Sequence, residues 1–142
     1  MNFLICWVSY PLIMKKTISL LLLFASTSAF GGWTDLGVGS KNTNFFADFD
    51  TLQRKNNIVR VWTKHEYKTP QPTSIPSVFM LSENFYTEFD CQEKKFRALS
   101  SNTFSENQLQ GSLIASNSTP NPWTYVPPDT IASSILNKVC KK

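Results

Sequence analysis

Hydrophobic and polar residues alternate along much of the chain beyond residue 32, which is the pattern of strands in a half-buried sheet. The alternation is strongest in residues 56–68, "NNIVRVWTKHEYK". One face of this strand carries Val59, Val61, Thr63, His65 and Tyr67, and the other carries Ile58, Arg60, Trp62, Lys64 and Glu66. The two faces are nearly equal in apolar content, so this strand alone leaves open which face meets the core.

Shorter alternating segments predict the other strands. They cover residues 33–40, 44–52, 79–91 and 94–104, with edge pieces at 109–116 and 123–128. Only Gln92 and Glu93 separate the segment that ends at Cys91 from the one that begins at Lys94, which favours a hairpin. Residues 69–77 hold three prolines, and because proline removes a backbone donor this segment is predicted to be a loop.

The C-terminal segment follows a different period. Ile131, Ile135 and Val139 recur at helical spacing, after an N-cap candidate at Asp129 or Thr130. An apolar stripe on a helix has to be buried, and the sheet is the partner that the pattern offers. The sequence therefore predicts an α+β fold, in which an antiparallel sheet carries one C-terminal helix.

The N-terminal residues look like a targeting segment rather than part of this domain. A basic pair precedes the apolar run "ISLLLLFA", and small residues follow it, which is the order found in secretory signal peptides. Small side chains at Ala29 and Gly31 fit cleavage before Gly32, and cleavage before Phe30 fits as well. The run is shorter than the ~20 residues that span a bilayer, so a membrane anchor is the weaker interpretation.

The first 13 residues, "MNFLICWVSYPLI", do not fit this pattern, so we interpret Met14 as the true start. One long leader with Lys15 and Lys16 in its middle is the alternative. On either interpretation residues 1–31 form a leader and signal peptide, and residues 32–142 form the mature domain. No cysteine stands at the end of the apolar run, which argues against a lipid anchor.

The mature segment has 111 residues, which is enough for one domain with one core. Without Lys15 and Lys16 it holds 12 basic and 10 acidic residues, so the net charge falls from +4 to +2. The basic residues form pairs such as Lys94-Lys95 but no stripe. This distribution lacks the electrostatic footprint of a nucleic-acid-binding protein.

Two cysteines, Cys91 and Cys140, remain once Cys6 is removed with the leader. An even number of cysteines in an exported chain favours a disulfide, and this bond would hold the helix to a strand end. Two alternatives stay open: free thiols, or a nucleophilic Cys91 with His65 as its base. A zinc site is disfavoured because the chain has one histidine and no CxxC pair.

Acid–base chemistry would have to come from paired carboxylates or from His65. Asp48 and Asp50 share one strand face, and so do Glu88 and Asp90. We interpret these pairs as solvated faces, and His65 as a structural histidine. The sequence has no GxSxG, P-loop or dinucleotide-binding glycine pattern, so we expect a protein that is not an enzyme and needs no cofactor or metal.

Aromatic side chains offer a binding surface instead. The candidates are Trp33, Trp62, Tyr86, Trp123 and Tyr125. If Val59, Val61 and Tyr67 face the helix, Trp62 turns outward between Arg60 and Lys64, and we predict a partner-binding site at these three residues. The alternative is that the sheet curls and buries Trp62 in a second small core.

The order of the motifs adds a family resemblance. The segments "VRVWTKHEYK", "EFDCQEKKFRAL" and "PWTYVPPDTIASSILNKVC" follow one another at domain-scale spacing. In this order they resemble the surface-adhesin protein E family of Gram-negative bacteria, from about Trp33 to Cys140. The most specific elements are Phe-Asp-Cys before a basic-aromatic strand, and Trp-x-x-Val-Pro before a helix that ends in cysteine.

The resemblance implies a curved antiparallel sheet of about six strands with a C-terminal helix, and a Cys91–Cys140 disulfide. It also implies an exported, non-enzymatic binding module whose partners include host or extracellular matrix proteins. The missing lipid anchor keeps a second interpretation open, a soluble periplasmic module that binds an envelope partner as an inhibitor or assembly subunit. We expect a location in the periplasm or at the cell surface, no membrane span after cleavage, and a homodimer as one form of association.

Overall fold

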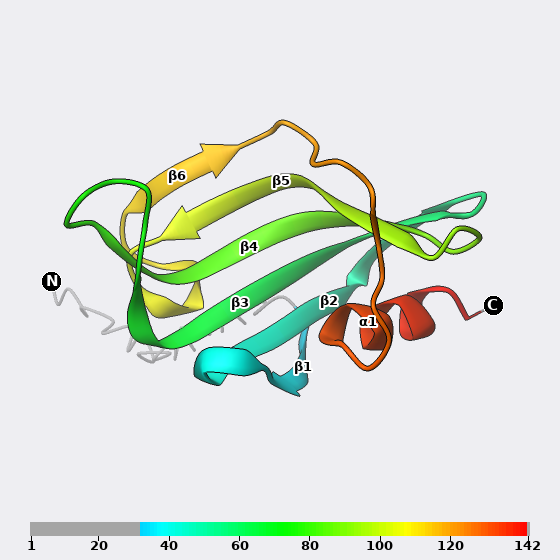
Figure 1. Cartoon of the computed structure of the whole chain (residues 1–142), viewed down its shortest axis with the longest axis horizontal. Helices are drawn as coiled ribbons and strands as arrows, with labels where there is room; N and C mark the ends of the chain where they lie inside the picture. Colours follow the sequence, from blue (N-terminus) through cyan, green and yellow to red (C-terminus); the bar gives the residue numbers. More distant parts are fainter. Residues whose placement is uncertain (1–31, 142) are drawn as a thin grey trace, which may run out of the picture.

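Within residues 32–141, which the computed structural model describes, seven strands form one antiparallel sheet with a single α-helix on one face (Figure 1). β1 (Trp33–Val38), β2 (Thr43–Lys55), β3 (Ile58–Pro72), β4 (Phe79–Asp90), β5 (Lys95–Phe104) and β6 (Leu113–Asn117) are neighbours in chain order, and β7 (Thr124–Tyr125) pairs with β5. The short 3-10 turns η1 (Ser40–Asn42) and η2 (Asn107–Leu109) precede β2 and β6, and the helix α1 (Ile131–Val139) follows β7. The predicted fold class is confirmed. The leader and signal peptide predicted for residues 1–31 lie outside the described residues.

The central strand is longer than the sequence pattern indicated. The prediction of a loop over 69–77 is wrong for its first four residues, because β3 continues to Pro72 and pairs there with the start of β4. The pairing register is interrupted between Glu66 and Gln71. Pro70 falls inside this interruption, where no ladder hydrogen bond requires the N–H that proline lacks. The loop itself is confined to residues 73–78.

The predicted hairpin between β4 and β5 is confirmed. Its turn takes four residues, 91–94, rather than two. The Asp90 side chain organises this turn, since its Oδ1 accepts hydrogen bonds from the backbone N–H groups of Gln92 and Glu93, each at 2.9 Å. Aspartate commonly folds a turn in this way by bonding backbone groups two or three residues ahead.

The hydrophobic core lies between the sheet and α1. It joins Ala47, Val59, Val61 and Phe89 of the sheet to Ile135, Leu136 and Val139 of the helix. Val59 and Val61 therefore face the helix as predicted, and Trp62 turns to the opposite face. Tyr67 is outside this core, and its hydroxyl donates to Glu83. Burial of aliphatic side chains of this size stabilises a fold by roughly 1.5–3 kcal/mol each.

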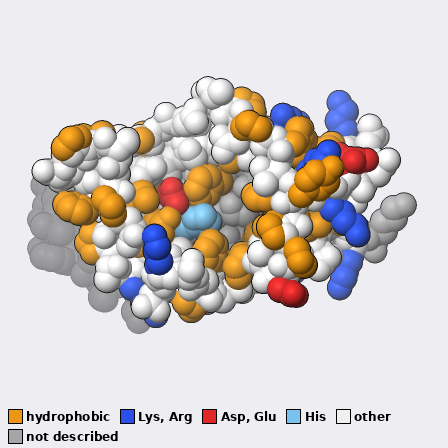
Figure 2. All heavy atoms as spheres, in the orientation of Figure 1, with side chains coloured by type: hydrophobic (Ala, Val, Ile, Leu, Met, Phe, Trp, Pro, Cys, Tyr) orange, Lys and Arg blue, Asp and Glu red, His pale blue; other side chains and the backbone are white. Residues whose placement is uncertain are grey.

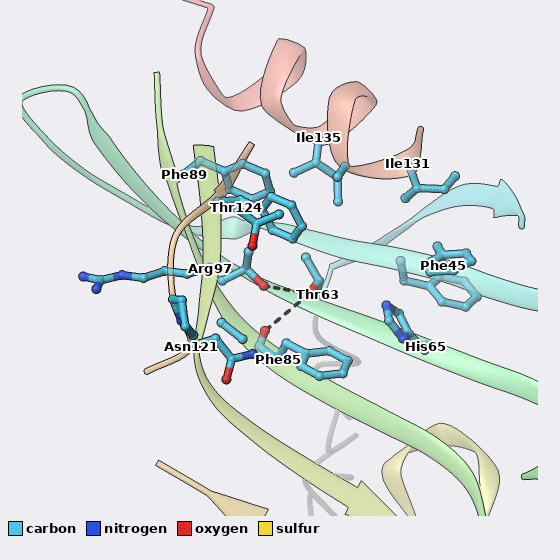
Figure 3. A pocket seen from close by; sticks show the side chains of 16 residues that line it. Phe45, Thr63, His65, Phe85, Phe89, Arg97, Asn121, Thr124, Ile131 and Ile135 are labelled. Carbon is cyan, nitrogen blue, oxygen red and sulfur yellow. Dashed lines mark hydrogen bonds between the residues drawn. The ribbon is translucent and has the colours of Figure 1, made fainter. Parts of the chain in front are cut away.

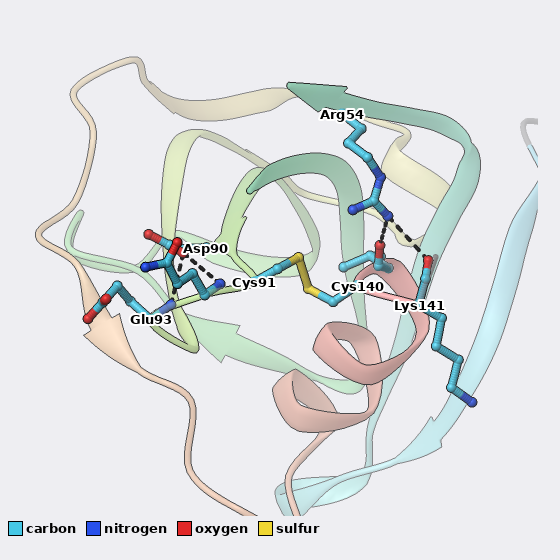
Figure 4. Close-up of a disulfide and its surroundings, with 8 residues drawn as sticks. Arg54, Asp90, Cys91, Glu93, Cys140 and Lys141 are labelled. Carbon is cyan, nitrogen blue, oxygen red and sulfur yellow. Dashed lines mark hydrogen bonds between the residues drawn. A yellow bond between two sulfur atoms is a disulfide. The ribbon is translucent and has the colours of Figure 1, made fainter. Parts of the chain in front are cut away.

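Two attachments fix the C-terminal end of α1 (Figure 4). A disulfide joins Cys140 to Cys91 at the start of the β4–β5 turn, with the Cα atoms 5.5 Å apart, which confirms the predicted bridge. Arg54 of β2 donates through Nη2 to the carbonyl oxygens of Val139 and Lys141. Lysine and arginine side chains at a helix C-terminus satisfy carbonyl groups that have no partner within the helix.

The N-terminal end of α1 carries a local cap. Thr130 is the N-cap residue, so of the two predicted candidates Asp129 is excluded. The Thr130 hydroxyl accepts from the Ser133 N–H at 3.2 Å, and the Ser133 hydroxyl lies 3.0 Å from the Thr130 N–H. This reciprocal pair is a capping box, with serine in the place that glutamate or glutamine usually takes.

Candidate binding sites on the two faces of the sheet

The face opposite α1, called the outer face below, presents Trp62 on β3 beside Tyr86 on β4. The two rings stack with centroids 5.0 Å apart and an angle of 30° between their planes. Trp62 is half-buried, so it is neither fully exposed nor sealed in a second core. The Tyr86 hydroxyl lies 3.1 Å from Gln53 Oε1 on β2, which fixes the outer edge of the stack.

Arg60 lies next to this stack and keeps its side chain 45% exposed. Its guanidinium binds the buried Glu88 carboxylate at 2.9 Å. Arg97 of β5 binds the other oxygen of Glu88 at 2.7 Å. Glu88 thus stays buried because two arginines compensate its charge, while Arg60 leaves surface available to a partner.

Lys64 does not have the place that the sequence pattern suggested. Its side chain is 3% exposed, and its Nζ forms an ion pair with Glu66 at 2.9 Å. The ammonium group also lies 4.6 Å from the ring centroid of Phe46 and 5.1 Å from that of Trp33. Lys64 is therefore enclosed beneath aromatic rings, which corrects the expectation of an exposed cation at this position.

The η2 turn completes this enclosure on the outer face. Asn107 Nδ2 donates to Glu66 Oε2 at 2.9 Å, and the Gln108 N–H donates to the same carboxylate at 3.0 Å. Gln108 Oε1 also accepts from Lys64 Nζ at 3.4 Å. The alternative interpretation was that Trp62 is buried in a second small core. A second buried cluster does form, but its centre is the Lys64–Glu66 ion pair and not Trp62.

The remaining candidate aromatics lie along the β5 side of the sheet. Trp123 stacks over the Arg97 guanidinium at 4.3 Å, and Tyr125 of β7 lies over Lys95 Nζ at 4.7 Å. Tyr125 is 67% exposed. Cation–aromatic contacts of this kind stabilise an exposed surface only modestly, by roughly 0.5–1 kcal/mol. Trp123 is connected to the surroundings of the Trp62–Tyr86 stack through Arg97, which shares Glu88 with Arg60.

The face that carries α1 holds a cavity that sequence reasoning missed. This helix-side pocket encloses about 400 Å³ and is lined mainly by Phe45, His65, Phe85, Phe89, Ile131 and Ile135 (Figure 3). Figure 2 shows the hollow on this face, with hydrophobic side chains around it and the histidine, coloured pale blue, inside. Alternation placed His65 on the same strand face as Val59 and Val61. It gave no sign that α1 and the segment 121–124 would leave a space above His65.

His65 is held in the pocket by its neighbours. Its ring meets the edge of Phe45 at a centroid distance of 4.5 Å and tilts against Phe85 at 4.8 Å. Its Nδ1 lies 3.2 Å from Glu83 Oε1, and the Tyr67 hydroxyl donates to the same oxygen. His65, predicted to be structural, therefore orients one ring nitrogen toward a carboxylate.

The shared carboxylate has a perturbed pKa. Burial acts to raise the pKa of Glu83, but the hydrogen bonds from His65 and Tyr67, together with the charge of His65, outweigh it and lower the pKa below 4.5. Burial, and then the hydrogen bond and negative charge of Glu83, raise the pKa of Tyr67 above 10.0. Around neutral pH Glu83 is thus an acceptor and Tyr67 a donor.

The carboxylate pairs noted in the sequence have structural partners. Asp48 Oδ1 accepts the Asp50 N–H at 3.1 Å, Glu88 binds two arginines, and Asp90 organises a turn. Asp48 and Glu88 are 7% and 3% exposed, so the interpretation of these pairs as solvated faces is wrong for these two residues. In the described part of the chain, no three His, Cys, Asp or Glu side chains are grouped so that they could hold a metal ion. No helix between residues 32 and 141 has the length and apolar character needed to cross a bilayer.

The fold and the motif order agree with comparisons to known proteins. Two crystal structures of Haemophilus influenzae protein E superpose on this chain with TM-scores of 0.59 and 0.58 at 18% and 19% identity. Each covers 77% of this chain, and the chain covers 87% and 75% of them, respectively. No curated protein sequence matches. The model of the family "Surface-adhesin protein E" matches residues 33–141, nearly the whole described segment. The chain therefore belongs to the surface-adhesin protein E family.

Proposed function

We propose that this protein is an exported, non-enzymatic binding module that acts as an adhesin at the cell surface, with host or extracellular matrix proteins among its partners. Family membership over residues 33–141 supports a binding role of adhesin type. The described residues offer hydrogen-bonded structural roles for the carboxylates that a catalyst would need. A protein-binding surface is therefore the feature to locate.

The outer-face patch, defined as Arg60, Trp62 and Tyr86, is the surface we assign to the partner. The observation that carries this assignment is the Trp62–Tyr86 stack at 5.0 Å beside a 45% exposed arginine. Tryptophan, tyrosine and arginine are the residues that most often dominate the energy of protein interfaces. Their rings are already ordered against each other, so binding would cost little side-chain entropy. The same patch would serve a second copy of this chain if a homodimer forms.

Binding to a reconstituted basement-membrane matrix tests the patch. We expect Trp62→Ala to weaken binding at least tenfold, since an interface hot spot is worth about 2 kcal/mol or more. Arg60→Ala should weaken it less, because Glu88 retains Arg97. Phe79→Ala is the matched control, because it removes an aromatic that is 53% exposed at the far end of β4. Equal losses for Trp62→Ala and Phe79→Ala would exclude the outer-face patch.

Location separates the adhesin from the soluble periplasmic module. An adhesin should be degraded when intact cells are treated with proteinase K, and it should remain with the cell envelope after osmotic shock. Protein that is protected in intact cells and released by shock would instead support a periplasmic module with an envelope partner.

Light scattering on the purified protein measures the homodimer directly, and Trp62→Ala should shift it to monomer if the patch is the dimer contact.

A further inference from the structure

The helix-side pocket is a second site, on the face opposite the outer-face patch. Its volume of about 400 Å³ is at the lower end of the range of roughly 300–1,000 Å³ that small-molecule sites occupy. Phe45, Phe85 and Ile131 are partly buried side chains that line this space. Because their apolar surface faces a cavity, an apolar body that entered it would remove this surface from water.

The walls favour an aromatic body. Phe45, Phe85, Phe89 and Phe96 all line the pocket together with the His65 ring. Phe45 and Phe85 contact His65 at 4.5 and 4.8 Å with their planes inclined by 66° and 50°. Aromatic rings attract one another in such edge-on and tilted arrangements at separations of about 4.5–7 Å. A planar ring placed among them would extend the same packing.

His65 is a polar group of the pocket with a defined hydrogen-bonding character. An ionised carboxylate can only accept, so the Glu83 oxygen 3.2 Å from His65 Nδ1 requires a proton on that nitrogen. Nε2 has a free lone pair only in the uncharged form of this ring, whereas in the charged form that lowers the pKa of Glu83 it carries a proton and donates. Among the hydrogen bonds of residues 32–141, none involves His65 Nε2, and the side chain is 27% exposed. In the uncharged ring Nε2 is thus an acceptor beside the rings of Phe45 and Phe85, in a pocket that Thr63, Thr87, Asn121 and Thr124 also line.

We propose that the helix-side pocket binds a small aromatic molecule with one hydroxyl group, a phenol or naphthol, whose ring packs among Phe45, Phe85 and Ile131. The hydroxyl donates its hydrogen bond to Nε2 of His65. Glu83 and Tyr67 are positioning residues that hold the imidazole in this tautomer. The nearby hydroxyls of Thr63 and Thr87 already bond each other at 3.1 Å. Asn121 and Thr124 also line the pocket, and the His65→Phe variant described below separates His65 from them as the acceptor.

Three matched probes test the proposal on the purified protein. They are 2-naphthol, 2-methoxynaphthalene, which keeps the oxygen but has no donor, and naphthalene. We expect 2-naphthol to bind most tightly in titration calorimetry, and to shift the methyl NMR signals of Ile131 and Ile135. His65→Phe keeps a ring but removes the acceptor, so it should weaken 2-naphthol roughly three- to tenfold and leave naphthalene unchanged. Ala132→Phe, which places a ring at the pocket wall formed by α1, should weaken all three probes.

The controls make the other outcomes decisive. Trp62→Ala, on the outer face, should leave 2-naphthol binding unchanged. Equal affinity for 2-naphthol and 2-methoxynaphthalene would overturn the role of His65 as acceptor. Absence of binding, or signal shifts at Trp62 or Trp123 in place of the two isoleucines, would overturn the pocket itself. The NMR signals are read on the unmodified protein, so the test holds even if Ala132→Phe does not fold.

Discussion

At the scale of single residues, Glu83 shows how a partly buried carboxylate makes stability depend on pH. It is compensated by hydrogen bonds from His65 and Tyr67, which outweigh the effect of burial and lower its pKa. A group whose pKa is lower in the folded than in the unfolded chain stabilises the fold above its unfolded pKa. This contribution is lost as the pH falls through the lowered folded pKa.

We therefore predict that Glu83→Gln is less stable than the unmodified protein at pH 7, and that the difference shrinks below about pH 4.5, the ordinary pKa of this group. Urea denaturation followed by tryptophan fluorescence at pH 7 and pH 3.5 measures it. Glu106→Gln changes an exposed carboxyl on η2's flank and should give no such pH-dependent difference. If the difference in the free energy of unfolding between Glu83→Gln and the unmodified protein is the same at both pH values, the proposed role of the carboxylate is contradicted.

At the scale of elements, the outer face of β3 is closed by the buried pair Lys64–Glu66, with side chains 3% and 7% exposed. Removing one partner leaves the other charge buried, which typically costs about 3–5 kcal/mol. We predict this loss for Lys64→Met, and recovery of most of it in Lys64→Met/Glu66→Leu. Chemical denaturation of the single and double variants measures the coupling directly.

Arg60→Met is the control for this cycle. Arg60 is 45% exposed and shares Glu88 with Arg97, so its loss should cost at most about 1 kcal/mol. Equal costs for Lys64→Met and Arg60→Met would mean that the Lys64 pair is solvated and that the outer face is open over it. This outcome would return Lys64 to the role of a surface cation.

The elements also show what could be read from the sequence. The alternation in β3 placed Val59 and Val61 together on one face, but it left open whether that face or the opposite one meets α1, and the packing of the core answers this. The same alternation placed Lys64 on the outer face but could not show its burial, which depends on Trp33, Phe46 and Gln108 arriving from other parts of the chain. The alternation within one strand determines on which face of the sheet a side chain lies, whereas the burial of a charged side chain depends on residues that are distant in the sequence.

The helix-side pocket could not be predicted from the sequence for a similar reason. His65 could be placed on the strand face of Val59 and Val61, but a cavity exists only where packing is incomplete, and hydrophobic periodicity carries no information about that. The prolines led to the wrong prediction that β3 ends before residue 69. A proline interrupts a strand only where its N–H would be needed for a hydrogen bond to the neighbouring strand. Pro70 lies where the register is interrupted, and only the pairing with β4 reveals this.

At the scale of the whole molecule, the Cys91–Cys140 disulfide closes a segment of the chain that contains β5, β6, β7 and α1. The two cysteines are 49 residues apart, and on the chain-entropy model a loop of this length contributes about 4 kcal/mol. We predict that Cys91→Ala/Cys140→Ala loses stability of this order, seen as a lower midpoint in thermal or urea unfolding. The unmodified protein in a strong reductant should match the double variant, whereas unchanged stability in both would show that the core alone holds α1.

The disulfide also determines how α1 can move. Cys140 and the Arg54 contacts hold its C-terminal end, while the hydrogen bonds of its cap stay within residues 127–134. A rigid body attached near one end pivots there, so any tilt of the helix displaces Ile131 far more than Val139. Ile131 is a wall of the helix-side pocket. We therefore expect any widening of the pocket around a bulkier guest to displace the Ile131 end of α1 while the Cys140 end stays in place.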